Sequence, residues 1–463
     1  MSKNAIAPER IFSLVAKRVS PTLEEAREEK AFAEKIRARL QRAFSKRATL
    51  FFVGSTARDT GIRGDRDIDI FVAFPKGKKK EAIVKDTVAT VKRTLPANWE
   101  MHYAEHPYLQ GKMQGYKLEV VPCFKIEVNE GIISAVDRTP LHAQYLQKHL
   151  SEKQKRDVRV LKALLKAHGI YGAELEVAGF SGLVCEYLIL NYRSLQNLLS
   201  ASSSWAPPIV LDIEDYYDQE YSALEKRFET PLIIIDFIDR NRNAAAAISP
   251  RSFSKFIAIS RAFLSAPSEK FFSLQSPSYP AKALENEIAR RNLIIIKTRR
   301  PGGLITDIMV PQLRRSESAL AKQLQMRDFR VFNSGSFYDE QNCYILLEIE
   351  NPSAYPLVKI KGPPLHLALD VRNFIKAHKK IERGPLIEGD RVVIEEKRQV
   401  LSALDALRKM LGAPKRVGIA SHFVSGIKAS TLLTGDSLLY ELRKNNSLRE
   451  KLAQFLLASD IIG

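Results

Sequence analysis

Cysteine is scarce in this 463-residue chain, which has three, Cys123, Cys185 and Cys343, far apart and each in an apolar context. A disulfide framework or a zinc site needs cysteines at closer, characteristic spacings, so the spacing here excludes both. We therefore expect the three side chains to be free, buried thiols in a protein that works in a reducing compartment.

Long apolar runs are also missing. No stretch approaches the roughly 18 apolar residues that a membrane-spanning helix needs. The N-terminal run Ile11–Ala16 is too short for the apolar core of a signal peptide. Internal repeats and low-complexity tracts are absent as well. These features predict a soluble, cytoplasmic protein.

Acidic residues are few relative to basic ones, with 53 Asp and Glu against 72 Lys and Arg and a formal net charge of +19. Such an excess favours a polyanionic partner, most often a nucleic acid, with an anionic membrane surface as the alternative. The basic residues are spread over the chain in small groups, which favours a broad basic surface over one juxtamembrane cluster. These groups are Lys78–Lys80, Arg299–Arg300, Arg314–Arg315, Lys379–Lys380 and Lys415–Arg416.

Asp67 and Asp69 are the most informative residues that the chain does contain. In a β-strand, residues two apart project from the same face, here about 7 Å from each other. Ile68, Ile70 and Val72 alternate with them and would anchor that strand in a core. Adjacent carboxylates repel unless a cation lies between them, and Mg²⁺ is the cation that commonly combines carboxylate and phosphate ligands. An isolated pair of this kind is usually a solvated surface pair, so the neighbouring residues must show whether this one is a binding site.

Those neighbours favour a site. The apolar segment Thr49–Val53 reads as a buried strand and is followed by Gly54 and Ser55. Gly54 permits a tight turn, and Ser55 is predicted to cap a short helix and to direct its hydroxyl and free N–H groups at an anion. Glu119, within a short apolar segment, is the best candidate for a third carboxylate, although such acids are often edge or surface residues. A phosphate cradle beside a metal site is therefore predicted.

The chain is long enough for three or four domains at about 150 residues each. Residues 21–45 are predicted to form one amphipathic helix, and residues 129–131 a hairpin turn. Thr139–Pro140 predicts a helix start with Thr as N-cap and Pro at the first helical position. Helices then dominate residues 139–265, and a cluster of proline and serine over 267–280 marks a boundary.

Beyond that boundary, helical and strand patterns alternate, so we expect an α+β region of one or two modules. The predicted helices cover residues 282–290, 309–327, 367–380 and 398–411, and the predicted strands cover residues 293–296, 329–333, 343–350 and 391–396.

The Gly-Ser turn and the Asp-x-Asp pair resemble the nucleotidyltransferase superfamily of DNA polymerase β. Six further blocks, in this order, are similar to the archaeal, class I CCA-adding enzymes, which are tRNA nucleotidyltransferases. The likeness is strong over about residues 20–270 and weaker towards the C-terminus, and the Arg-rich nucleotide-reading motif of class II enzymes is absent. The blocks are Ala104–Tyr108, Glu119–Cys123, Ser134–Pro140, His168–Glu174, Gly179–Gly182 and Arg240–Ala245.

This resemblance implies an α+β fold in three parts. Residues 1–138 would form the polymerase β-like catalytic domain, and residues 139–270 a helical central domain that completes the nucleotide pocket. Residues 271–463 would form an α+β body and tail that bind the tRNA acceptor arm. The resemblance also suggests a homodimer.

The resemblance assigns the catalytic, metal-binding role to Asp67, Asp69 and Glu119, which would hold two Mg²⁺ ions. Two departures from the family pattern concern this set. The third position is commonly Asp in the family, whereas this chain has the longer Glu119. Conversely, Glu also occurs in the family where this chain has Asp67.

The resemblance further implies a set of nucleotide contacts. The triphosphate contacts would be Ser55, Arg58, Lys162 and Tyr171, the ribose contact Thr139, and the base contacts His142 and Arg242. Each has an ordinary structural alternative: Lys162 on a solvated helix face, Tyr171 packed in a loop, Thr139 as a cap, His142 half-buried, and Arg242 paired with Asp236 or Asp239.

The implied reaction is template-free addition of C, C and A to the tRNA 3′ end from CTP and ATP, with release of pyrophosphate. One alternative is another template-free RNA nucleotidyltransferase, such as a poly(A) polymerase. A catalytically silent tRNA-binding protein is a second, although three retained acids argue against it. A small-molecule nucleotidyltransferase is a third, disfavoured by the long C-terminal region and the net charge of +19.

Overall fold

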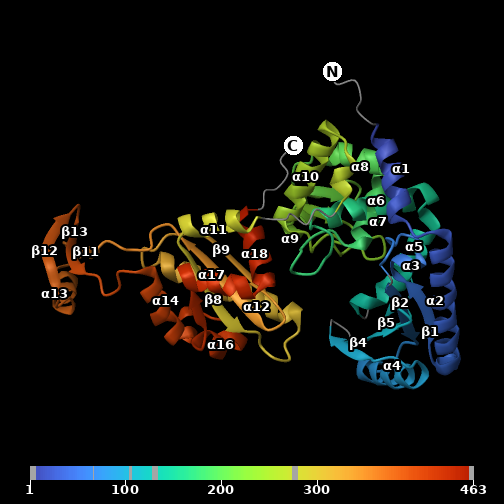
Figure 1. Ribbon diagram of the computed structural model, residues 1–463, viewed down its shortest axis with the longest axis horizontal. Helices are drawn as coiled ribbons and strands as arrows, with labels where there is room; N and C mark the ends of the chain where they lie inside the picture. Colours follow the sequence, from blue (N-terminus) through green and yellow to red (C-terminus); the bar gives the residue numbers. More distant parts are fainter. Residues whose placement is uncertain (1–6, 66, 104–106, 128–133, 274–279, 458–463) are drawn as a thin grey trace. The chain divides into compact units, whose positions relative to one another are not determined.

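The computed structural model describes residues 7–65, 67–103, 107–127, 134–273 and 280–457. The chain divides into two compact units, one within residues 1–276 and the other within residues 277–459 (Figure 1). Within the described ranges, no helix is both long and apolar enough to cross a membrane.

A five-stranded sheet forms the centre of the N-terminal part of the first unit. Its strands, in spatial order, are β1 (Thr49–Val53), β2 (Asp67–Phe74), β5 (Tyr116–Phe124), β4 (Pro107–Met113) and β3 (Glu100–Tyr103). β2 and β5 are parallel, and the other neighbouring pairs are antiparallel. The strand predicted to carry the two aspartates is thus a central strand of this sheet.

Alternation along β2 separates the two faces of the sheet, as its sequence predicts. Ile68, Ile70 and Val72 pack on the face covered by α2 (Leu23–Phe44) and α4 (Lys80–Thr94) (Figure 1). Phe71 and Ala73 face the other side and pack with residues of α5 (Thr139–His149). The remaining short helices of this part are η1 (Ser45–Arg47), α3 (Gly54–Ala57) and η2 (Ala135–Arg138).

The helix predicted over residues 21–45 is confirmed as α2, which begins after a capping box between Thr22 and Glu25. The prediction that Thr139 caps a helix is wrong. The one-turn helix η2 runs directly into α5, so Thr139 already has helical angles of φ −60° and ψ −41°. The predicted hairpin at residues 129–131 lies outside the described residues.

The rest of the first unit is mainly helical and has one large apolar core, with a smaller cluster around Leu224, Ile233 and Ile235. Its helices are α1 (Pro8–Val19), α6 (Glu152–Ala167), α7 (Gly182–Tyr192), α8 (Leu195–Ser202), α9 (Ser222–Phe228), α10 (Pro250–Ser265) and η3 (Glu269–Phe272). The region also contains two short parallel strands, β6 (Ile209–Leu211) and β7 (Leu232–Ile234), which the helical prediction did not include. The short N-terminal apolar run is the buried face of α1.

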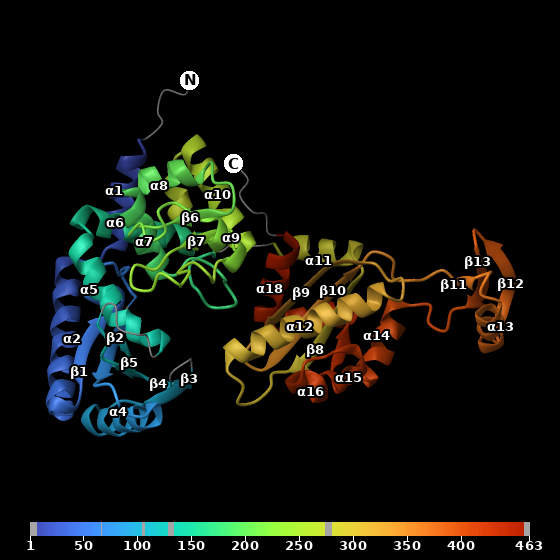
Figure 2. The same ribbon diagram turned by 180° about the vertical axis from the view of Figure 1, so that it is seen from behind.

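A four-stranded sheet forms the core of the second unit, with the order β14 (Thr431–Leu433), β8 (Leu293–Arg299), β10 (Asn342–Ile349) and β9 (Val331–Tyr338). Helices cover both faces, which explains why β8 and β10 read as continuous apolar runs. Helix α12 (Thr306–Gln325) lies over one face of this sheet (Figure 2). Ile294 and Ile345 pack on that face, whereas Ile295 and Leu346 pack on the opposite face. The helices are α11 (Ala281–Arg290), α12 (Thr306–Gln325), α14 (Ala403–Gly412), α15 (Pro414–Val417), η4 (Ser421–Phe423), α16 (Val424–Lys428), α17 (Gly435–Lys444) and α18 (Asn446–Leu457).

A three-stranded antiparallel sheet is inserted between β10 and α14. It consists of β11 (Leu357–Pro364), β13 (Arg391–Lys397) and β12 (Ile381–Glu388), with α13 (Ala368–Ala377) packed on it through Phe374 beside Gly362. The predicted α+β character of the second unit is confirmed. The predicted helix start at residue 398 is wrong, because Ser402 caps α14 through the N–H of Asp405.

Candidate active site

The three predicted carboxylates lie on one face of the first sheet. Asp69 is paired in register with Val53 on β1 and with Glu119 on β5, and Asp67 precedes it by two residues. Because neighbouring residues in register project to the same side, Asp67, Asp69 and Glu119 share a face. Gly54, at φ +72°, lies directly against Asp69, since a Cβ at Gly54 would be 2.0 Å from Asp69 Oδ2. This close approach requires glycine at the turn.

Negative charge accumulates on this face. Burial, together with the charges of Glu119 and Asp67, raises the pKa of Asp69 to about 6, and the charges of Arg58 and Lys117 oppose this shift. The pKa of Asp67 is also raised, chiefly by burial, with Lys117 opposing the shift. A cation among these oxygens would therefore be stabilised by the site.

The structure gives Glu119 two close partners. Lys117 Nζ lies 2.7 Å from Glu119 Oε1, and Gln110 Nε2 donates a hydrogen bond of 2.8 Å to the same oxygen. In the part of the chain that the structure describes, no three Asp, Glu, His or Cys side chains are gathered closely enough to hold a metal ion. The acids are thus aligned on one face but not assembled into a metal cage, and metal binding by them stays a prediction.

Ser55 lies in the short helix α3, immediately after Gly54. The prediction that its side chain caps this helix is wrong, because α3 already begins at Gly54, and this fully described helix has no side-chain cap. The Ser55 side chain is half-buried beside Gly61, 3.5 Å from the position of a Cβ there. Ser55 thus stands at the turn next to Asp69, as expected, but without the capping role.

A buried ionic cluster connects α3 with the helical region. Glu186 on α7 is fully buried and accepts hydrogen bonds from Arg58 Nε at 3.0 Å and Thr60 Oγ1 at 2.5 Å. The second oxygen of Glu186 lies 3.0 Å from Arg58 Nη2. Lys162 on α6 donates to the carbonyl oxygen of Thr60 at 2.8 Å. Arg58 thus pairs directly with Glu186, and Lys162 is linked to the same carboxylate through Thr60, which contacts both.

Lys162 and Tyr171 meet at the beginning of α7. A Cβ at Gly182 would lie 3.3 Å from Tyr171 Oη and 3.6 Å from Lys162 Nζ, so both groups lie close to the backbone of Gly182. Lys162 is 2 % exposed, which rules out the solvated-face alternative. Burial lowers the pKa of Lys162 and raises that of Tyr171.

The predicted base contacts meet at a different buried acid, Asp236, which lies just after β7. His142 Nε2 is 2.8 Å from Asp236 Oδ1, and Arg242 Nη1 is 2.5 Å from Asp236 Oδ2. Burial would raise the pKa of Asp236, but hydrogen bonding and charge from His142, the N–H of Ile238 and the charge of Arg242 together hold it well below its usual range. The pairing of Arg242 with Asp236, an alternative in the sequence, is therefore present.

These groups are linked through α5. Thr139, half-buried, opens this helix one turn before His142. Gln147 Nε2, farther along α5, donates to the carbonyl oxygen of Ala57 at 2.7 Å, so α5 lies against α3. The carboxylate strand, the turn after β1 and the predicted base contacts thus belong to one packed assembly within the first unit.

Sequence reasoning missed two residues that organise the site, Glu186 and Lys117, and weighed Asp236 only as a partner for Arg242. A usable signal existed for Glu186, because it is a lone acid inside the apolar run Leu183–Leu190. A charge in such a run is costly unless it is paired. Which cation pairs with it could not be read from the chain, since Arg58 is 128 positions away.

Three family models match successive parts of the chain. The model described as "Nucleotidyltransferase domain" matches residues 33–142. That described as "tRNA nucleotidyltransferase, second domain" matches residues 156–273, and that described as "CCA-adding enzyme, C-terminal domain" matches residues 290–430.

Curated archaeal proteins are similar over most of the chain. A protein of Methanocaldococcus jannaschii named CCA-adding enzyme is 39% identical over 346 residues, covering 72% of this chain and 75% of that protein. One of the same name from Methanococcus maripaludis strain C7 is 36% identical, covering 79% and 84%. One from Pyrobaculum neutrophilum is 34% identical over 433 residues, covering 92% and 99%.

Proposed function

Because the chain belongs to the family of archaeal CCA-adding enzymes, we propose that it adds C, C and A to the 3′ end of tRNA by nucleotidyl transfer, with CTP and ATP as substrates. The observation that carries the proposal is the alignment of Asp69 with Glu119 on adjacent parallel strands, with Gly54 pressed against Asp69. The tRNA 3′-oxygen bonds to the α-phosphorus, the bond from that phosphorus to pyrophosphate breaks, and the hydroxyl proton leaves.

Asp67, Asp69 and Glu119 are the residues that would hold Mg²⁺. They offer only oxygen ligands, which suits Mg²⁺. A cation would relieve the burial cost and the repulsion from Glu119 and Asp67 that together raise the pKa of Asp69. When bound, a pair of such ions supplies charge stabilisation to the attacking oxygen and to the departing pyrophosphate. In the absence of metal, the ammonium group of Lys117 neutralises part of the Glu119 charge.

Arg58, Lys162 and Tyr171 would receive the triphosphate, with Ser55 at the adjacent turn. The buried cluster has two cations for one carboxylate, so it retains positive charge for an anionic ligand. Lys162 has three N–H donors, and its two hydrogen bonds to Thr60, at 2.8 Å to the carbonyl oxygen and 3.4 Å to the hydroxyl, leave one for a phosphate oxygen. Fixed donors of this kind stabilise the charge that develops on pyrophosphate without reorganising.

Thr139 would contact the ribose, while His142 and Arg242 would contact the incoming base. Cytosine and adenine each offer an acceptor ring nitrogen on the edge where uracil and guanine carry an N–H group. An arginine, which can only donate, therefore favours the first pair. Because Asp236 occupies one terminal nitrogen of Arg242, the other donors of this half-buried guanidinium remain for the base.

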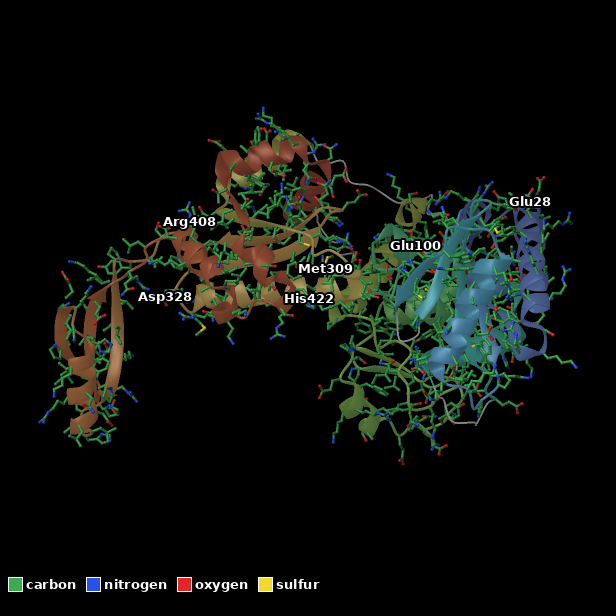
Figure 3. The ribbon with its side chains drawn as sticks, turned by 90° about the horizontal axis from the view of Figure 1, so that it is seen from below. Glu28, Glu100, Met309, Asp328, Arg408 and His422 are labelled. Atoms are coloured by element: carbon green, nitrogen blue, oxygen red, sulfur yellow. The ribbon has the colours of Figure 1, made fainter. Side chains whose placement is uncertain are left out.

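The second unit would bind the tRNA acceptor arm through phosphate contacts and shape, as A-form RNA requires. Four of the basic groups seen in the sequence lie in this unit and are largely exposed, namely Arg299–Arg300, Arg314–Arg315, Lys379–Lys380 and Lys415–Arg416. Arg408 and His422 also project from its surface (Figure 3). The suggested homodimer stays a prediction, which sedimentation velocity would test.

In the decisive experiment, purified protein is incubated with Mg²⁺ and a tRNA that lacks its 3′ triplet. Each labelled nucleotide is added in a separate reaction, and the extended ends are then sequenced. We expect incorporation of C, C and A and no further extension. A long homopolymer on unrelated RNA would instead indicate a poly(A) polymerase, and the absence of extension would indicate a silent tRNA-binding protein.

The Asp69→Asn variant tests the site itself. We expect loss of CTP and ATP incorporation with near-normal tRNA binding, because the substitution removes one carboxylate charge from the shared face. Asp86→Asn is the matched control, since Asp86 pairs with Arg47 away from this face. Full activity of Asp69→Asn would eliminate the proposed site.

A further inference from the structure

Asp236 joins the two predicted base contacts into one unit. The residue is fully buried, and both of its oxygens are occupied. Oδ1 meets His142 Nε2 at 2.8 Å and accepts the backbone N–H of Ile238 at 2.9 Å, while Oδ2 meets Arg242 Nη1 at 2.5 Å. One carboxylate therefore connects His142 on α5 with Arg242 in the loop after β7, and these two residues lie 100 positions apart in the sequence.

The state of Asp236 determines what its partners can do. Because its pKa is held below the usual range, the side chain is an ionised acceptor, and the His142 nitrogen that faces it carries a hydrogen. The guanidinium of Arg242 is 34 % exposed and bears one charge-assisted contact to this buried anchor. Without that contact, a long side chain at this exposure would sample several rotamers.

We propose that Asp236 is a positioning residue for nucleotide choice, which fixes Arg242 and His142 together against the edge of the incoming base. This inference rests on the proposed function, in which those two residues contact the base. A guanidinium held in one position binds preferentially to a base that presents an acceptor nitrogen at that position, as cytosine and adenine do. A guanidinium that can move also reaches the keto oxygens of uracil and guanine. Loss of Asp236 should therefore lower the selectivity between nucleotides more than it lowers the rate of incorporation.

The Asp236→Asn variant tests the inference because it keeps the shape and removes the charge. Asparagine offers one acceptor oxygen and one NH₂ group, so it cannot serve both His142 Nε2–H and Arg242. In single-turnover incorporation of each nucleotide on tRNA lacking its 3′ triplet, the preference for CTP over UTP and for ATP over GTP should fall by about 10-fold or more. Binding of tRNA should not change.

Asp239→Asn is the matched control. Asp239 lies in the same loop, loses the same charge and pairs with Arg138 at 2.7 Å rather than with a base contact. Its selectivity among the four nucleotides should equal that of the wild type. Equal loss of incorporation for all four nucleotides in Asp236→Asn would mean that Asp236 only supports the fold, and would overturn the inference.

A double-mutant cycle tests whether Asp236 acts through Arg242. If it does, Arg242→Ala and the combined Asp236→Asn, Arg242→Ala variant should show the same loss of discrimination, whereas additive losses would contradict the inference. If Asp236→Asn does not fold by circular dichroism, Asp236→Glu replaces it, since the displaced carboxylate should still lower selectivity. Unchanged selectivity in Asp236→Glu would then overturn the inference. Failure of the wild type to incorporate C and A would instead refute the proposed function.

Discussion

Replacing Glu186 with glutamine should destabilise the first unit severely. The carboxylate is fully buried and is the counter-charge of Arg58, which is 7 % exposed. Among the acids, Glu186 also has the largest effect on the pKa of Lys162, which is 2 % exposed. Removal of one partner from a buried ion pair leaves an uncompensated buried charge, at a cost of about 3–5 kcal/mol in free energy of unfolding. Glutamine keeps the side-chain volume, so little of this cost should come from a cavity.

The assay is urea unfolding followed by tryptophan fluorescence. The two tryptophans, Trp99 and Trp205, both lie in the first unit, so the signal reports on that unit alone. Glu152→Gln serves as the matched control, because Glu152 pairs with Lys155 at 2.7 Å but is 82 % exposed. An exposed pair of this kind contributes about 0–1 kcal/mol, so the control should unfold near the wild-type urea concentration.

The pH dependence of the Glu186→Gln variant provides a second check. Burial lowers the pKa of Lys162, and the charge of Glu186 opposes that shift. Without Glu186, the folded pKa of Lys162 should fall further, and the unfolded state then binds more protons than the folded state. Stability of the variant should therefore rise as pH increases above 7. A loss below about 1 kcal/mol at every pH would refute the view that Glu186 neutralises these buried cations.

Three further predictions follow from other contacts. Because the folded pKa of Asp236 is lowered, its stabilising contribution is complete above the ordinary aspartate value of about 3.9 and is lost below it. The stability advantage of the wild type over Asp236→Asn should hence shrink between pH 4 and pH 2 in urea titrations, and a constant difference would contradict this. Lys117→Met removes the cation 2.7 Å from Glu119. Thermal stabilisation by Mg²⁺ should then reach its midpoint at an Mg²⁺ concentration about 2- to 5-fold lower than in the wild type. An unchanged midpoint would show that Lys117 does not compete with the metal. Binding of tRNA should weaken steeply as the salt concentration rises. If Arg315 on α12 contacts a phosphate, Arg315→Ala should reduce the slope of log affinity against log salt concentration by about 1. An unchanged slope would exclude that contact.

Much of the face that carries the three acids follows from local sequence patterns. The alternation of Ile68, Ile70 and Val72 with the two aspartates predicted a strand with both acids on one side, and β2 has that arrangement. Gly54 was assigned to a tight turn, and its φ of +72° against Asp69 agrees. The amphipathic period of residues 21–45 predicts helix α2, although the Thr22 capping box that begins it comes from the structure. Each of these features depends on neighbours within a few residues.

Local patterns failed where two segments compete for one role. Thr139 before proline has the composition of an N-cap, yet the preceding turn of helix continues through it. Lys162 lies among basic residues on α6, yet it points into the interior, because Thr60 and Glu186 offer it partners there. The Thr139 outcome is local, because Ser134 and Asp137 form a capping box that begins the preceding turn. The Lys162 outcome is not written in the flanking residues, since it depends on which distant segment packs against α6.

The sequence by itself determined the identity of the acids, the strand that carries two of them, the basic character of the chain and the family to which it belongs. Only the tertiary structure decided that Glu119 stands beside Asp69, that Glu186 holds Arg58, and that Asp236 joins His142 to Arg242. The physical reason is the range of the forces involved. Backbone geometry and side-chain periodicity act over a few residues, whereas a buried charge takes its partner from whichever distant segment the packing of the core brings within hydrogen-bonding distance.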